Sequence, residues 1–353
     1  METTRRLIYD LDLPDLKNQL EAWGEPAYRA VQIWQGLYKQ FWSASEQFTS
    51  LSVSLRQQLD EQFIFSALTP GQVLQSSDLE TTKTLFSLPD QRAIEAVLMK
   101  YDERRTLCIS TQAGCAMGCV FCATGQMGFK RNLTSGEIVE QVLYYARLLK
   151  NEGEHVTNIV VMGMGEPFHN YDATMSAINR LNDPQGMMLG ERRFTISTVG
   201  LVPMIKKFAS EKRQINLAIS LHAANDTLRS QLLPVNLKYP ISDLLSACRE
   251  YIEETKRRLT FEYALIYDVN DSAEDTHALA RLLHGMMCHV NIIPLNPTHR
   301  YAGQATTRQR ADAFRNVLVE AGIPCTIRLR RGIDIEAGCG QLAIESPQNS
   351  SER

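Results

Sequence analysis

Three cysteines lie within eight residues of one another, in the segment Cys115-Ala-Met-Gly-Cys119-Val-Phe-Cys122. Three thiolates at this spacing can bind one soft metal centre. A complete [4Fe-4S] site has four cysteine ligands, and no other cysteine lies near the segment except Cys108. The spacing therefore predicts an iron–sulfur cluster that leaves one iron open for a ligand from outside the protein.

Two alternatives compete with a cluster at this segment. A zinc site with three cysteine ligands needs a fourth donor, and the nearest histidine after the segment is the distant His155. Zinc sites also usually space their cysteines in two pairs. A chance group of structural cysteines has no packing reason to gather in a glycine-rich loop. We expect such packing roles only for the isolated cysteines Cys248, Cys288 and Cys325.

The bulk composition is typical of a globular protein without a membrane span. The chain has 353 residues, of which 44% are hydrophobic and 22% are charged. It contains no apolar run of about 18 residues and no secretory signal, so we expect a cytoplasmic protein with reduced thiols. The net charge of −3 neither indicates nor excludes a nucleic-acid partner. Any contact with RNA must therefore come from a local basic patch.

The two ends of the chain differ from its centre. Residues 1–66 repeat apolar side chains at spacings of three and four, which predicts a small helical domain. It contains none of the candidate motif residues, so we expect it to position a substrate. Residues 346–353 are polar, and we expect a frayed tail there.

Residues 67–104 read as a linking β-hairpin. Strand-like runs occupy 84–88 and 93–100, and the expected turns lie at Pro70-Gly71 and Pro89-Asp90. Glu95 alternates with apolar residues in the second run, which is typical of an acid on the outer surface of a sheet.

From residue 105 to residue 345, short β-rich runs alternate with helical patterns. The expected strands are 106–110, 158–162, 194–198, 216–221, 260–266, 289–294 and 325–329. Three helices have the clearest patterns. One begins at the capping box Thr134-Ser-Gly-Glu137, and the other two span about 272–286 and about 308–321. This alternation predicts an α/β fold with a parallel sheet. The number of units is short of eight, which favours a partial (βα)6 barrel with its active residues at the carboxyl ends of the strands.

The cysteine triplet, with an aromatic residue before its last cysteine, resembles the motif of the radical S-adenosylmethionine (SAM) superfamily. The wider segment 108–134 resembles the RlmN/Cfr family, and within it the dual-specificity adenine-C2 methyltransferases of 23S rRNA and tRNA. The resemblance continues in order through Gly163–Pro167, Ile196–Thr198, Ala218–His222, Pro294–Pro297 and Arg331–Leu342. It covers nearly the whole chain and implies a radical SAM barrel.

The resemblance implies two cofactors. One is a [4Fe-4S] cluster bound by Cys115, Cys119 and Cys122, and the other is SAM, which chelates the open iron of that cluster. In this family the reduced cluster cleaves SAM to a 5′-deoxyadenosyl radical. By the same resemblance, Gly165 and Glu166 bind the methionyl amine of SAM. The other implied SAM contacts are Ser197, Ser220, Leu221, His222 and Asn296. By pattern alone, the glycines mark an ordinary turn, and His222 is a satisfied core histidine.

Three further residues carry the chemistry that the resemblance implies. Cys339 is methylated first and delivers the methyl group from S-methylcysteine to C2, through a covalent protein–RNA adduct. Glu95 accepts the C2 proton, and Cys108 releases the product by forming a transient disulfide with Cys339. By pattern alone, Cys339 is a surface thiol and Cys108 is a buried strand residue. Gly338 stands where alanine is commoner, a difference that we expect to be harmless.

The implied partners are 23S rRNA, tRNA, an external electron donor and a thiol reductant. Nothing in the sequence demands more than a monomer. Several basic residues flank the expected site and, as a set, favour RNA. They are Lys130, Arg131, Arg192, Arg193, Arg328, Arg330 and Arg331.

Two other functions stay open at this level. One is methylation of adenine C8, as in the Cfr enzymes, although 126–129 and 328–331 look more like the C2 class. The other is a non-catalytic iron–sulfur protein that binds RNA or senses redox state. That function predicts four protein ligands for the cluster, and the absence of a nearby fourth cysteine argues against it.

Overall fold

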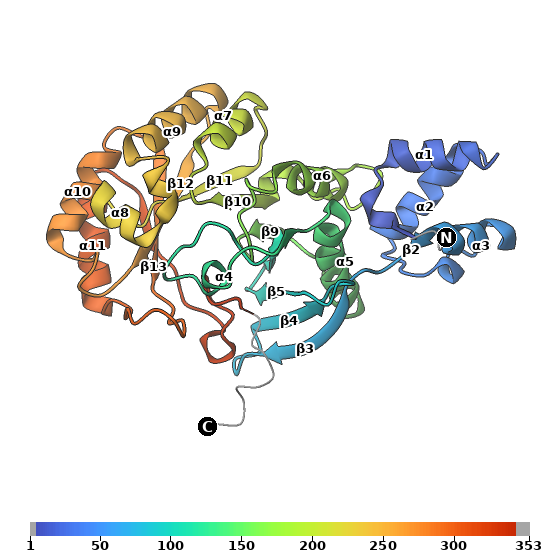
Figure 1. Ribbon diagram of the computed structural model, residues 1–353, viewed down its shortest axis with the longest axis horizontal. Helices are drawn as coiled ribbons and strands as arrows, with labels where there is room; N and C mark the ends of the chain where they lie inside the picture. The colour runs from blue at the N-terminus through green and yellow to red at the C-terminus, as the bar shows by residue number, and fades with distance from the viewer. Residues whose placement is uncertain (1–4, 344–353) are drawn as a thin grey trace.

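A parallel sheet of seven strands, joined by helices, forms the centre of the computed structural model, which describes residues 5–343. The strands lie side by side in chain order: β6 (Arg105–Cys108), β9 (Asn158–Val161), β10 (Phe194–Thr198), β11 (Asn216–Ser220), β12 (Leu259–Leu265), β13 (Cys288–Pro294) and β14 (Cys325–Ile327). Six crossovers join the seven strands, so the predicted partial (βα)6 barrel is confirmed, with β14 as a closing strand (Figure 1).

The crossover helices cover the outer face of this sheet (Figure 1). They are α5 (Ser135–Asn151), α6 (Tyr171–Asn182), α7 (Val202–Ser210), α9 (Ile241–Thr255), α10 (Ala273–Leu283) and α11 (Arg308–Glu320). The short helix α8 (Asp226–Leu232) lies instead beside the segment with the cysteine triplet, where the Leu232 carbonyl accepts from the Val120 N–H at 3.1 Å. The predicted capping box starts α5, where Thr134 Oγ1 accepts from the Glu137 N–H at 3.2 Å and the Glu137 carboxylate accepts from the Thr134 N–H at 2.9 Å. Among residues 5–343, no helix is long and apolar enough to cross a membrane.

The β-hairpin prediction for 67–104 was incomplete. Three antiparallel strands extend the barrel sheet beyond β6, in the order β5 (Ala93–Lys100), β4 (Thr81–Ser87) and β3 (Thr69–Gln75). Pro70 and Gly71, which were expected in a turn, lie in the edge strand β3, and its register shifts between Pro70 and Val73. An edge strand tolerates proline, and β3 is almost entirely exposed, so it shows no apolar alternation.

The N-terminal region is helical, as predicted. Its helices are α1 (Leu13–Ala22), α2 (Tyr28–Tyr38) and α3 (Val53–Gln62), and β1 (Arg6–Leu7) pairs with β2 (Phe63–Ile64). The region packs beside α5 and α6 (Figure 1), where the Gly136 N–H donates to Asp10 Oδ1 at 2.8 Å and Arg180 Nε donates to the Leu11 carbonyl at 2.9 Å. One continuous apolar core joins it to the barrel.

Candidate active site

The cysteine loop follows β6 at the carboxyl end of the barrel strands. It is closed by the short pair β7 (Gln112–Ala113) and β8 (Arg131–Asn132) and contains the one-turn helix α4 (Ala123–Gln126). Two glycines permit its close packing. A Cβ on Gly114, at φ +74°, would lie 1.9 Å from the Gly128 carbonyl oxygen, and a Cβ on Gly125 would lie 2.9 Å from that of Cys119.

All three cysteines of the loop line one cavity of about 160 Å³, which we call the cluster cavity. It is lined by Cys115, Met117, Cys119, Phe121, Cys122, Val161, Met162, Gly163, Gly165, Glu166, Ser197, Val199, Ser220, His222, Leu233, Glu262, Ala264, Ile293, Leu295, Asn296, Cys339 and Gly340. The loop therefore presents three sulfur atoms to a space bounded by the ends of the parallel strands, where a barrel active site is expected.

The environment of these thiols disfavours charge in the absence of a metal. Burial raises the pKa of Cys115 to about 12, and burial followed by the charges of its neighbouring cysteines raises the pKa of Cys119 well above its usual value. Burial also raises the pKa of Cys122, although N–H groups of Gly125 and Thr124 that donate to its sulfur oppose the effect. Metal ligation requires thiolates, so a cationic centre would have to compensate these costs.

The donor set fits an iron–sulfur cluster. Soft thiolates suit such a centre, and Cys115, Cys119 and Cys122 share one cavity. In such a cluster each cysteine thiolate binds a different iron atom. Within the described range, 5–343, no group of three His, Cys, Asp or Glu side chains is already arranged to hold a metal ion.

The glycine turn after β9 places Glu166 in the wall of the cluster cavity. Gly165 has φ +103°, and a Cβ there would lie 2.6 Å from the Gln112 side chain. Glu166 Oε1 accepts from the Phe168 N–H and Oε2 from the Val199 N–H, each at 2.9 Å. Burial raises the pKa of Glu166 to about 7. The turn thus holds a fixed carboxylate that can accept from an ammonium group.

Most of the other residues implied as SAM contacts line the same cavity. Ser197 and Ser220 lie on β10 and β11, and Asn296 lies just past β13. Asn296 Nδ2 donates to the Cys339 carbonyl at 3.0 Å, and its buried Oδ1 has no hydrogen-bond partner in the described part of the chain. That unpaired acceptor is available to a ligand. Leu221 differs, because its side chain is fully buried and does not line the cavity.

His222 makes a hydrogen bond within the fold and also lines the cluster cavity. Its backbone is left-handed, at φ +59°, and its Nδ1 accepts from the Ala264 N–H at 2.8 Å. Burial lowers the pKa of His222 to about 3, so the ring stays neutral. Phe121 of the cysteine loop meets this ring edge to face, with 5.0 Å between the ring centres.

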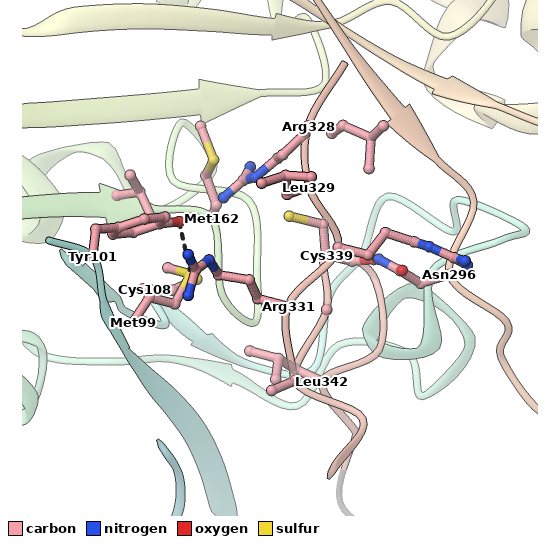
Figure 2. Close-up of a pocket in the computed structure, with 15 residues that line it drawn as sticks. Met99, Tyr101, Cys108, Met162, Asn296, Arg328, Leu329, Arg331, Cys339 and Leu342 are labelled. Atoms are coloured by element: carbon pink, nitrogen blue, oxygen red, sulfur yellow. Dashed lines mark hydrogen bonds between the residues drawn. The ribbon is translucent and has the colours of Figure 1, made fainter. Parts of the chain in front are cut away.

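A second, smaller cavity of about 40 Å³ brings together Cys108 and Cys339, and we call it the cysteine-pair cavity (Figure 2). It is lined by Met99, Tyr101, Cys108, Val160, Met162, Ile293, Asn296, Arg328, Leu329, Arg330, Arg331, Ala337, Gly338, Cys339 and Leu342. Cys108 ends β6, and Cys339 comes from the chain after β14. Both are free thiols.

The two thiols of the pair differ in environment. Cys108 is buried, and burial followed by the nearby Cys339 raises its pKa to about 12. Cys339 is only partly buried. The charge of a Cys339 thiolate, and after it the Glu262 carboxylate, raises the pKa of Arg328, which places the guanidinium in the field of that sulfur. This arrangement suits Cys339 as the nucleophile and Cys108 as a protected thiol.

Cys339 lines both cavities. Met162, Ile293 and Asn296 also line both cavities. A group bound in the cluster cavity and a group that reaches Cys108 would therefore meet at the Cys339 sulfur.

The alternation pattern predicts that Glu95 lies on the outer surface of the sheet, and this prediction is wrong. Glu95 is buried, forms an ion pair with Lys83 at 3.2 Å and accepts from the Ala343 N–H at 3.0 Å. Directly paired residues share a face of a sheet, and Lys83, Val97 and Cys108 lie in one such row. Glu95, two residues from Val97, is on the same face as Cys108, although it does not line either cavity.

The basic residues divide into three groups. Arg328, Arg330 and Arg331 line the cysteine-pair cavity, as expected for residues beside the site. Arg192 and Arg193 do not flank it, because they precede β10 and therefore lie at the amino ends of the strands.

The two remaining basic residues lie near the cysteine loop. Arg131 is bound by Asp90 and Glu137, and Lys130 is exposed. Of the isolated cysteines, Cys248 and Cys288 are buried in the core, as predicted, and Cys325 is partly buried on β14.

Sequence reasoning overlooked Lys83 and Glu262. Glu262 is a buried carboxylate on β12 that lines the cluster cavity and accepts from Asn291 Nδ2 at 2.8 Å. The sequence feature that could have indicated Glu262 is a single acidic residue between two aromatic residues in a predicted strand. Lys83 gave a similar signal, a single cation in a run that becomes the buried strand β4.

Comparisons with known proteins give the class first. The sequence model of the radical SAM superfamily matches residues 109–280. A crystal structure of a radical SAM methyltransferase from Sphaerobacter thermophilus is 50% identical, with a TM-score of 0.94, over 96% of this chain and 99% of that one. The fold is therefore that of a radical SAM enzyme.

The particular family follows from the rest of the chain. Residues 7–65 match the model of the ribosomal RNA large subunit methyltransferase N-terminal domain. The dual-specificity RNA methyltransferase RlmN 1 of Myxococcus xanthus is 49% identical over 95% of this chain and 93% of its own length. A probable dual-specificity RNA methyltransferase RlmN of Chloroflexus aurantiacus is also 49% identical, over 96% of this chain and 93% of that protein. The chain belongs to the RlmN family.

Proposed function

We propose that this chain methylates C2 of a specific adenosine in 23S rRNA and of the adenosine next to the anticodon in tRNA. Membership of the RlmN family supports this substrate class. The observation that carries the proposal is the position of Cys339, which lines both the cluster cavity and the cysteine-pair cavity. A methyl carrier has to meet SAM on one side and the acceptor base on the other.

The chemistry of the target explains the need for a radical enzyme. Adenine C2 is an electron-poor aromatic carbon, so it is not a nucleophile that can displace the methyl group of SAM. The [4Fe-4S] cluster and its SAM supply a 5′-deoxyadenosyl radical that can take a hydrogen atom from a methyl group. The protein has to hold the cluster, orient SAM and present the methyl group to both.

The walls of the cluster cavity divide these tasks. Cys115, Cys119 and Cys122 would hold the cluster. Glu166, whose carboxylate is fixed by two backbone N–H groups, would bind the ammonium of SAM beside Gly165. The further contacts would come from Ser197, Ser220, His222 and Asn296, and Leu221 would act only through its backbone or by supporting the wall.

The cysteine pair would carry the methyl group and release the product. Cys339 sulfur would attack the methyl carbon of one SAM and release S-adenosylhomocysteine, and after hydrogen abstraction the same carbon would bond to C2. Glu95 would take the C2 proton, and the external one-electron carrier would take up the unpaired electron that the radical addition leaves on the adduct. Cys108 sulfur would then attack Cys339 sulfur, so that the disulfide forms, the bond from sulfur to carbon breaks, and the freed carbon keeps that electron pair and takes up a proton. A thiol reductant restores both thiols.

The RNA side of the site would be the rim of the cysteine-pair cavity. Arg330 lines it and can bind a phosphate, whereas Arg331 is ion-paired with Glu80. The target base has to leave its stack to reach the Cys339 sulfur from this rim. The N-terminal helical domain would position the RNA. An external electron donor reduces the cluster, and we propose a monomeric, cytoplasmic enzyme.

Reconstitution tests the proposed function. The protein is loaded anaerobically with iron and sulfide and incubated with SAM, a reductant and a 23S rRNA fragment, and the digested RNA is analysed by mass spectrometry. Formation of 2-methyladenosine is the expected result. A product methylated at C8 would instead identify a Cfr-type enzyme, and an intact cluster without SAM cleavage would identify a non-catalytic iron–sulfur protein.

A further inference from the structure

A buried ion pair fastens both ends of the segment that carries Cys339. Lys83 Nζ lies 3.2 Å from Glu95 Oε1 and also donates to the Glu336 carbonyl at 3.2 Å. Glu95 Oε2 accepts from the Ala343 N–H at 3.0 Å. The side chains of Lys83 and Glu95 are only 8% and 7% exposed. One pair of charges on β4 and β5 therefore holds the first and the last residue of segment 336–343.

The middle of segment 336–343 is attached elsewhere. The Ala123 N–H donates to the Gly340 carbonyl at 2.7 Å, and Thr124 Oγ1 donates to the Leu342 carbonyl at 2.6 Å. These bonds tie the middle to the cysteine loop, next to the Asn296 bond to the Cys339 carbonyl. The ends and the middle thus depend on different partners, so loss of the ion pair would leave the segment attached only through its middle and would give Cys339 more freedom to move.

The groups around Glu95 shift the pKa of its carboxyl group in opposite directions. Burial raises its pKa, and the ammonium of Lys83 on β4 opposes this effect, as does the Ala343 N–H. The Glu336 carboxylate, at the start of the same segment, raises the pKa further. Without the cation, burial and Glu336 would both favour the protonated acid, which cannot accept a proton.

We propose that Lys83 is a positioning residue for the reaction, because its ammonium pairs with the Glu95 carboxylate and joins it in fastening segment 336–343. The inference rests on the proposed function, in which Glu95 accepts the C2 proton. That proton moves to a Glu95 oxygen, and the electron pair of the C2–H bond stays in the purine. The carboxylate charge then disappears, and the hold on both ends of the segment weakens at the stage when Cys108 has to reach the Cys339 sulfur.

The test compares Lys83→Met with Lys83→Arg and with the matched surface variant Lys100→Met, whose side chain pairs with Glu152 at the protein surface. The rate of 2-methyladenosine formation is measured from about pH 6 to about pH 9, together with 5′-deoxyadenosine and the methyl load on Cys339. Lys83→Met should be roughly tenfold slower near pH 7 and should recover as pH rises, because loss of the cation raises the pKa of Glu95 and leaves less of the carboxyl group anionic. Lys83→Arg should restore the wild-type pH profile, and Lys100→Met should keep it.

A second measurement reports on the segment itself. Iodoacetamide should alkylate Cys339 several-fold faster in folded Lys83→Met than in the wild type, and thermal unfolding identifies a variant that does not fold. Lys83→Gln then takes the place of Lys83→Met. An unchanged pH profile, or an equal loss at every pH that Lys83→Arg does not rescue, would overturn the role of Lys83. Failure of the wild-type protein to form 2-methyladenosine would instead overturn the proposed function.

Discussion

The two cavities at the carboxyl end of the barrel are built in different ways. The cluster cavity, of about 160 Å³, is formed by one continuous loop and the ends of successive parallel strands. The cysteine-pair cavity, of about 40 Å³, is formed where β5 and β6 meet a segment near the end of the chain. Its two thiols, on Cys108 and Cys339, come from opposite ends of the barrel sequence.

This difference separates the generic part of the enzyme from the specific part. In the proposed function, the cysteine ligands, the glycine turn and the strand ends would generate the radical, and all of them belong to the barrel. Carrying the methyl group would also need the antiparallel strands β4 and β5, because Lys83 and Glu95 anchor the segment that contains Cys339. The extension of the sheet is thus a platform for the second cavity rather than a linker.

The largest effect should come from the cysteine loop, which forms one wall of the cluster cavity. Cys119→Ala should abolish the cluster, because two thiolates do not hold four irons stably. Both 5′-deoxyadenosine and methylated RNA should fall below detection, as measured by iron content, visible absorption and chromatography. Cys325→Ala, on β14 away from both cavities, is the control. A Cys119→Ala protein with full iron content and normal SAM cleavage would refute the ligand assignment.

Glu95→Gln should separate the two cavities. The amide keeps the size of the side chain but cannot accept a proton, so formation of 2-methyladenosine should fall roughly 10²- to 10⁴-fold. Methylation of Cys339 and SAM cleavage should continue, since Glu95 does not line the cluster cavity. Mass spectrometry of the protein and the RNA measures the two steps. Equal losses in both would show that Glu95 acts on the fold and not on the proton.

Glu166→Gln should act on the cluster cavity with a smaller effect. In the amide, one of the two backbone N–H groups, on Phe168 or Val199, keeps only a neutral acceptor and the other faces an NH2 donor, while the ammonium of SAM would lose its anion. A charge-assisted hydrogen bond contributes about 1.5–3 kcal/mol, so SAM should bind roughly tenfold to a hundredfold more weakly. Equilibrium dialysis of the reconstituted protein measures this, and unchanged SAM affinity would remove Glu166 from the SAM site.

The sequence predicted the cluster cavity better than the cysteine-pair cavity for a physical reason. The cysteine triplet and the glycine turn are local, and strand order follows chain order in a parallel barrel, so Ser197 and Ser220 could be placed at strand ends. Each barrel strand was predicted to within two residues, and every one except β14 has a buried apolar run.

The second cavity depends on pairings that a period-two pattern does not reveal. Glu95 alternates with apolar residues, yet β5 is buried on both faces, because α5 covers one and the C-terminal segment covers the other. The pattern therefore indicated a surface acid. Lys83 was missed for the same reason, and β3 was missed because an exposed edge strand needs no apolar side chains.

The central claim, that Cys339 carries the methyl group and Cys108 releases the product, can be tested on denaturing gels. Cys108→Ala and Cys339→Ala proteins are purified from cells, treated with ribonuclease and compared with Cys325→Ala. The Cys108→Ala protein should retain covalently bound nucleotide, because no thiol is left to attack the Cys339 sulfur, and the other two should carry none. Nucleotide on Cys339→Ala but not on Cys108→Ala would reverse the roles. Absence from both, with RNA still methylated, would contradict the covalent mechanism.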